Sequence, residues 1–84
     1  MANYLIQFKY NGRDEQVPFE SGYIFQPNSN PQILADEACE VAETYIHEKH
    51  LEIEGQVVYD LRLFGKNGDF LINVDEFRKQ MKNG

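Results

Sequence analysis

Two stretches in which hydrophobic and polar residues alternate predict two β-hairpins, one in each half of the chain. In residues 3–19, apolar side chains recur at every second position until an Asn-Gly pair at positions 11–12 interrupts them. Such a pair readily adopts the two positive φ angles of a tight two-residue turn, and the turn fixes the register of the strands. Residues 57–74 repeat this arrangement around an Asn-Gly pair at positions 67–68. We therefore expect two antiparallel strand pairs.

The two turns predict which residues face each other across each hairpin. Both registers place opposite charges together and apolar residues together, as stable strand pairs require. The apolar and charged pairs on which we rely are Lys9 with Asp14, Ile6 with Val17, Tyr4 with Phe19, Leu63 with Ile72, and Phe64 with Leu71. Pro18 cannot donate a hydrogen bond to a neighbouring strand, so the second strand is expected at an edge of the sheet.

Residues 31–50 have the apolar periodicity of an amphipathic α-helix. At 100° per residue, one side of this helix collects apolar residues, which should pack on the sheet. These are Leu34, Ala38, Val41, Ala42 and Tyr45, flanked by Ala35 and Ile46. An aromatic loop at 20–30 precedes the helix and contains Tyr23 or Phe25 as its inward side chain, and Ser29 or Asn30 as the cap. A second, short helix is expected at 75–81.

The order of these elements, ββαββα, predicts an α+β fold. Because 84 residues bury only one modest core, residues 1–84 should form a single small domain. With the second strand at an edge and a right-handed crossover, the predicted spatial order is 2-1-3-4. The sheet would then be four-stranded and fully antiparallel, with the long helix on one face.

The outward side of the long helix is strongly acidic. Residues 36–54 contain seven of the fourteen acidic residues and one base, Lys49, in a chain of net charge -6. Eight scattered basic residues disfavour direct binding to nucleic acid or to anionic membranes, which usually requires clustered Lys and Arg. The residues expected to meet a partner are Asp36, Glu37, Glu40, Glu43 and Glu48, which we call the acidic face.

Regularly spaced carboxylates on a rigid helix can imitate a phosphate backbone. We therefore expect the acidic face to bind a basic protein, in particular a nucleic-acid-binding protein whose basic groove it would occupy. Phage-encoded inhibitors of host defence enzymes act in this style, an analogy that makes inhibition the working hypothesis. The alternative is that the charges only keep a surface helix soluble.

One segment, residues 60–77 with the four residues that follow, resembles the loop and exiting helix of an EF-hand calcium site. The matches are Asn67, Asp69, Ile72 and Glu76 at the third, fifth, eighth and twelfth loop positions. Gly65 replaces the first carboxylate ligand, and Phe70 stands where the EF-hand loop needs glycine for its sharp turn. The resemblance implies a cation-binding loop, whereas the alternating pattern predicts a hairpin over the same residues.

Two further surfaces provide alternative functions. Glu43, His47 and His50 are spaced i, i+4 and i+7, so that on a helix they could converge on a divalent metal. Phe64 and Leu71 should point away from the long helix, together with Val58, and form a partner contact or a homodimer interface. The alternative for this second surface is that the C-terminal helix covers it through Phe77 and Met81.

No motif indicates an enzyme or a bound cofactor. The chain has no glycine-rich phosphate loop, no nucleophile elbow and no carboxylate pair with catalytic spacing. Cys39 is the single cysteine, which excludes an internal disulfide, and its acidic neighbours would raise the pKa of its thiol. With apolar runs of at most three residues, we expect a cytoplasmic protein that does not enter a membrane.

Overall fold

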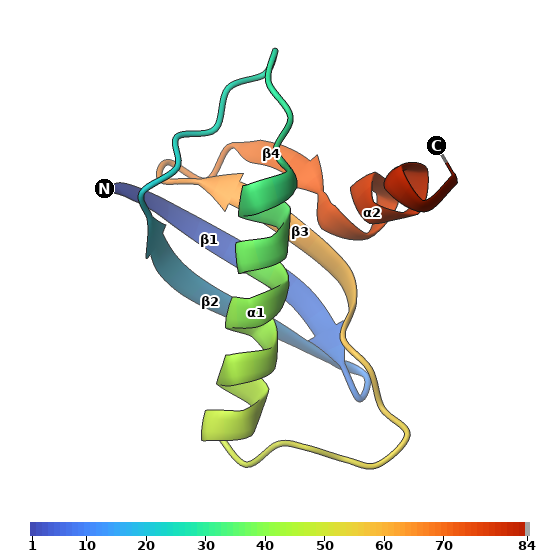
Figure 1. The fold of residues 1–84 in the computed structure, drawn as a ribbon. Helices are drawn as coiled ribbons and strands as arrows, with labels where there is room; N and C mark the ends of the chain where they lie inside the picture. The colour runs from blue at the N-terminus through green and yellow to red at the C-terminus, as the bar shows by residue number, and fades with distance from the viewer. Residues whose placement is uncertain (84) are drawn as a thin grey trace.

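The structure is a computed structural model that describes residues 1–83, with side chains described for residues 1–80. This part of the chain forms four strands and two helices in the predicted order ββαββα. They are β1 (Ala2–Tyr10), β2 (Arg13–Ser21), α1 (Gln32–Glu48), β3 (Tyr59–Gly65), β4 (Phe70–Asn73) and α2 (Val74–Asn83). The sheet is antiparallel with the order β2-β1-β3-β4, and α1 lies across one of its faces (Figure 1). The α+β fold and the predicted strand order are therefore confirmed.

The first hairpin has the predicted turn and register. Asn11 and Gly12 both adopt positive φ angles, of 53° and 76°, as a two-residue hairpin turn requires. Lys9 faces Asp14, Ile6 faces Val17 and Tyr4 faces Phe19. Strand β2, which contains the proline, lies at the edge of the sheet.

The second hairpin corrects one predicted pair. Leu63 faces Ile72 as expected, but Phe64 faces Phe70 instead of Leu71. The cause is a turn one residue longer than predicted: the N–H of Gly65 donates to the carbonyl oxygen of Asp69 at 2.8 Å, which leaves three residues in the loop. In such loops a single glycine with positive φ, here at position 68 with 84°, completes the turn.

A register shift in β4 absorbs the extra residue and changes the direction of Leu71. Leu71 packs against the hydrophobic core, whereas the prediction placed it on the opposite face of the sheet. Phe70 takes the predicted position of Leu71, with 57% of its surface exposed. The rings of Phe64 and Phe70 meet edge to face with centroids 5.7 Å apart.

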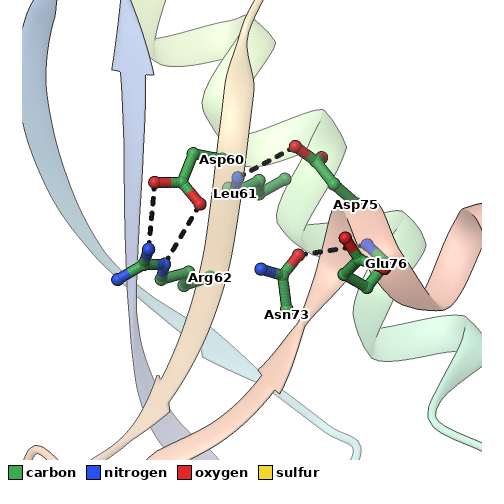
Figure 2. A network of polar contacts seen from close by, with 6 residues as sticks. All are labelled: Asp60, Leu61, Arg62, Asn73, Asp75 and Glu76. Carbon is green, nitrogen blue, oxygen red and sulfur yellow. Dashed lines mark hydrogen bonds and ion pairs between the residues drawn. The ribbon is translucent and has the colours of Figure 1, made fainter.

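The segment that resembles an EF-hand folds as β3, a turn, β4 and α2. Since a strand lies where an EF-hand has its entering helix, the resemblance does not extend to the fold, and the hairpin prediction is confirmed. Helix α2 begins where Asn73 Oδ1 accepts a hydrogen bond from the N–H of Glu76 at 3.0 Å (Figure 2). Asn73 thus caps α2 as an N-cap residue.

Helix α1 approaches the sheet through small side chains. Ala35, Ala38 and Ala42 are at most 1% exposed, and their small side chains allow the helix to pack closely on the sheet. The buried stripe is turned slightly from the predicted one, because Val41 and Tyr45 are only half-buried. No helix within residues 1–83 combines the length and the apolar character needed to cross a membrane.

The long helix is two residues shorter at its C-terminus than predicted. It ends at Glu48, and His50 adopts a left-handed conformation with φ 56°. The N–H of Leu51 then bonds back to the carbonyl oxygen of Ile46 at 3.0 Å, which satisfies one of the last free carbonyls of the helix. His50 therefore lies beyond the helix and does not share its face with Glu43.

Strand β3 contains a bulge that α2 stabilises. Asp60 has a φ of 55°, and the register between β1 and β3 shifts at this position. The bulge frees the N–H of Leu61 from the ladder, and it donates to Asp75 Oδ2 at 3.3 Å, in the first turn of α2 (Figure 2). The Asp60 carboxylate in the bulge accepts two hydrogen bonds from the guanidinium of Arg62, at 3.1 and 3.2 Å. The start of α2 is thereby fixed to the middle of the sheet.

Helix α2 packs on the same side of the sheet as α1. It contacts α1 and β3, and Phe77 joins the edge of the core. The alternative in which the C-terminal helix covers the opposite face is therefore wrong as far as Phe77 is concerned. The Met81 side chain lies outside the described residues.

Candidate functional site

The acidic face is exposed on α1 as the periodicity predicts. Glu37 is half-buried, and its other four members, Asp36, Glu40, Glu43 and Glu48, are exposed. The ion pairs among the described side chains join His47 to Glu52 and Arg62 to Asp60, so neither involves the acidic face. At 1.5 Å per residue, the carboxylates cover about 18 Å of helix length. Among the side chains of residues 1–80, they form a row of negative charge that no ion pair neutralises.

One side of this row borders a groove between α1 and the edge strand, which we call the β2 groove. Its volume is about 330 Å³, and it has an apolar floor and an acidic rim. The floor is formed by Val17, Phe19, Val41 and Tyr45, and the rim by Glu20, Glu37, Glu40 and Glu48. The acidic face is therefore continuous with an apolar strip, and β2 adds a carboxylate to it.

The β2 groove also holds a phenol next to a carboxylate. The hydroxyl of Tyr45 donates to Glu15 Oε1 at 3.3 Å, and the Tyr45 ring meets the buried ring of Phe8 edge to face. Desolvation, and after it the charge of Glu15, raises the pKa of the Tyr45 hydroxyl. The hydroxyl therefore remains a hydrogen-bond donor at neutral pH.

The opposite side of the row borders a larger hollow, which we call the loop pocket. It has a volume of about 620 Å³ and lies between α1, the connection from α1 to β3, and α2. Its lining includes the buried side chains of Tyr10, Ile46 and Leu61 and the exposed side chains of Ile53 and Val57. Glu43 belongs both to this pocket and to the acidic face.

Cys39 lies in the wall of the loop pocket and is not an activated nucleophile. Its sulfur accepts a hydrogen bond from Arg78 at 2.9 Å, across the contact between α1 and α2. Burial raises the pKa of the Cys39 thiol, and the guanidinium of Arg78 only partly opposes this effect. The thiol is therefore protonated at neutral pH, which suits a structural contact better than covalent chemistry.

The structure does not bring the predicted metal ligands together. His50 lies past the end of α1, and His47 Nδ1 is 3.0 Å from Glu52 Oε1 in the following segment. Within the described residues, no three His, Cys, Asp or Glu side chains are grouped so that they could hold a metal ion. Glu43, His47 and His50 therefore do not form the convergent set that the spacing predicted.

The second predicted contact surface exists with a different membership. Cross-strand neighbours share a face of the sheet, and the register aligns four apolar residues across all four strands on the face away from α1. These are Pro18, Leu5, Phe64 and Phe70, in the order β2, β1, β3, β4. Phe64 was predicted for this surface, which we call the outer face. Leu71 and Val58 were predicted there too, but both pack against the hydrophobic core instead.

Sequence reasoning missed both hollows beside α1. The helical period identifies the carboxylates of α1, but the β2 groove depends on the distance between α1 and an edge strand, and the loop pocket on the path of a connection without regular structure. One signal in the sequence did point to the loop pocket: the apolar residues at positions 53, 57 and 58 were not assigned to the predicted core.

In comparisons with known proteins, no protein-family model matches the chain, and no curated protein or solved structure is significantly similar to it. A function is therefore inferred from the arrangement of side chains described above.

Proposed function

We propose that this chain is a small, non-enzymatic binding protein of the cytoplasm whose acidic face attaches to a basic surface of a partner protein. The observation that supports this proposal is the row of five α1 carboxylates, none of which is ion-paired within the described side chains. An unpaired row of one sign attracts a surface of the opposite sign and accelerates association with it.

The proposed class of partner is a nucleic-acid-binding protein. Large continuous basic surfaces on proteins are typical of those that bind phosphate backbones. A helix with carboxylates along about 18 Å would compete for such a surface and exclude DNA or RNA from it. The proposed outcome of binding is therefore inhibition of the partner.

The two hollows beside α1 support binding to a protein over simple solubility. A helix that only needs charge for solubility has no need for apolar grooves along both of its flanks. Protein interfaces combine a few apolar anchors with a polar rim, and both hollows have this composition.

The test is salt-dependent capture of the partner with a matched pair of charge-reversed variants. Immobilised wild-type chain should retain a basic protein at about 0.1 M salt and release it at about 1 M, where screening is nearly complete. Glu40→Lys should weaken retention strongly. Asp14→Lys changes the charge equally at an exposed position on β2 outside the acidic face, and should have little effect.

The retained protein should also be displaced by duplex DNA or RNA. The proposal would be contradicted if retention did not depend on salt concentration, if Glu40→Lys and Asp14→Lys weakened retention equally, or if the retained protein were not basic. Urea unfolding of each variant verifies that the fold is intact.

A second candidate function is self-association through the outer face. The four-residue apolar row supports it, and the side chain of Phe70 in this row is 57% exposed. Sedimentation equilibrium of the wild-type chain should then show a dimer, and Phe70→Glu should convert it to a monomer. A wild-type monomer at high concentration would exclude this function.

A further inference from the structure

The loop pocket is a concave apolar site beside the acidic face. Its volume of about 620 Å³ lies within the range of pockets that enclose a bound group. Ile46 and Leu61 form a buried floor, while Ile53 and Val57 remain 45% and 71% exposed. Single exposed apolar residues are common on proteins, but these two line the same hollow, and their apolar surface would leave water when a ligand enters.

The walls of the loop pocket are held in place by hydrogen bonds. Tyr10, in the floor, accepts a hydrogen bond from the N–H of Ile53 at 2.8 Å and so ties the connection between α1 and β3 to the sheet. On the other side of the pocket, Arg78 donates a hydrogen bond to the sulfur of Cys39. The N–H of Leu61 donates to the carboxylate of Asp75 (Figure 2). Because three walls are fixed before a ligand arrives, little ordering is required on binding.

The charge around the loop pocket is negative. Four carboxylates and one guanidinium contribute to its lining, and they are Glu43, Glu52, Glu54, Asp75 and Arg78. Glu52 is paired with His47, and Asp75 with a backbone N–H. Glu43 and Glu54 make no hydrogen bond or ion pair with the described side chains, so they are the carboxylates available to a ligand. An apolar floor with an acidic rim favours a ligand that has an apolar body and a positive charge.

We propose that the loop pocket receives an apolar side chain, flanked by Lys or Arg, from the basic partner that binds the acidic face. This proposal rests on the proposed function, because Glu43 belongs to both surfaces. The apolar side chain fills the hollow as an anchor, and its basic neighbours meet Glu43 and Glu54. Interfaces commonly obtain most of their affinity from such an anchor, whereas exposed charges mainly accelerate and orient the encounter.

The experiment titrates the full chain, labelled with ¹⁵N, with three end-capped tripeptides and follows backbone amide shifts. Lys-Phe-Lys carries the proposed anchor and charges, Glu-Phe-Glu reverses the charges, and Lys-Gly-Lys lacks the anchor. Lys-Phe-Lys should produce saturable shifts at Ile53, Val57 and Val58. Glu-Phe-Glu should bind about tenfold more weakly, and Lys-Gly-Lys should leave these amides unmoved.

A matched pair of variants locates the site. Val57→Ser removes apolar wall from the pocket and should weaken Lys-Phe-Lys binding by about threefold or more. Ile24→Ser is the control, because Ile24 has the same exposure of 71% but lies in the loop before α1, outside the pocket lining. It should bind like the wild type.

Several results would overturn the pocket proposal: no binding of Lys-Phe-Lys at millimolar concentration, equal binding of Glu-Phe-Glu or Lys-Gly-Lys, or no difference between Val57→Ser and Ile24→Ser. If these occur while capture of a basic partner still depends on salt, only the pocket proposal fails. If the three peptides differ in binding as expected but partner capture does not depend on salt concentration, it is the proposed function of the acidic face that fails.

Discussion

Replacing Tyr4 by Phe removes one hydroxyl from the start of β1 and leaves its ring in the core. The ring is 6% exposed, so the apolar burial is retained in the variant. The hydroxyl donates to the carbonyl oxygen of Tyr23 at 2.7 Å and accepts from the N–H of Phe25 at 2.8 Å. Both bonds fasten the loop that leads into α1, so the substitution isolates their contribution to stability.

The expected loss follows from the number and quality of these bonds. An intramolecular hydrogen bond contributes about 1 kcal/mol net, so Tyr4→Phe should lower the free energy of unfolding by about 2 kcal/mol. Tyr10→Phe is the internal comparison, because its hydroxyl makes one good bond, at 2.8 Å to the N–H of Ile53, and one at the 3.5 Å limit. It should cost about 1 kcal/mol. In a domain of this size, each kcal/mol lowers Tm by roughly 4–8 °C.

The assay is urea unfolding followed by far-UV circular dichroism, combined with amide hydrogen exchange. Both variants should keep the wild-type m value while their midpoints fall, and exchange should accelerate at Phe25 in Tyr4→Phe and at Ile53 in Tyr10→Phe. A loss below about 0.5 kcal/mol for Tyr4→Phe, or a larger loss for Tyr10→Phe, would refute the reasoning.

Three further substitutions or reactions test local features of the fold. Asn73→Ala removes the cap of α2 and should cost about 1 kcal/mol in urea unfolding, with faster amide exchange in α2 but not in β1. Gly65→Ala would place its Cβ 2.7 Å from Asp69 Oδ1, so we expect a loss of about 1 kcal/mol that Asp69→Ala largely reverses in the double variant. Because burial raises the pKa of Cys39, iodoacetamide should modify the folded chain more slowly than the urea-unfolded chain at about pH 8; equal rates would contradict the protonated, half-buried thiol.

The two hairpins show what alternation and turn residues can and cannot predict. Around Asn11 and Gly12 both φ angles are positive, so the two-residue turn and the side-chain pattern require the same register. In the second hairpin only Gly68 of the Asn-Gly pair has a positive φ angle, and the loop has three residues. The sequence Asn-Gly is compatible with both turns. The edge-to-face contact between Phe64 and Phe70 accompanies the three-residue turn, and because it joins two strands it forms only after they pair.

The acidic face was predictable because it depends on one local period, whereas the hollows beside it depend on contacts between distant residues. The loop pocket exists because Tyr10 holds Ile53, 43 positions later, through a hydroxyl whose partner cannot be read from the sequence. His50 failed as a metal ligand for a similar reason. The helix end was predicted only to within a turn, and the left-handed conformation at His50 moved its side chain off the helical face.

The acidic face should reduce the stability of the fold that displays it. On α1, Glu40 lies four residues after Asp36, three after Glu37 and three before Glu43, so its carboxylate has three like-charged neighbours. Like charges at these spacings destabilise a helix by about 0.2–0.5 kcal/mol per pair. The described side chains provide no ion pair that offsets this repulsion.

Neutralising Glu40 therefore separates a structural role from a binding role, because the two predict opposite signs. If the carboxylate serves only the partner, Glu40→Gln should raise the free energy of unfolding by about 0.6–1.5 kcal/mol at low salt, and added salt should erase the gain. The same variant should bind the partner more weakly. A loss of stability in urea unfolding would show instead that the carboxylate supports the fold. Stability gained together with affinity lost is the combination expected of a residue retained for function at the expense of the fold.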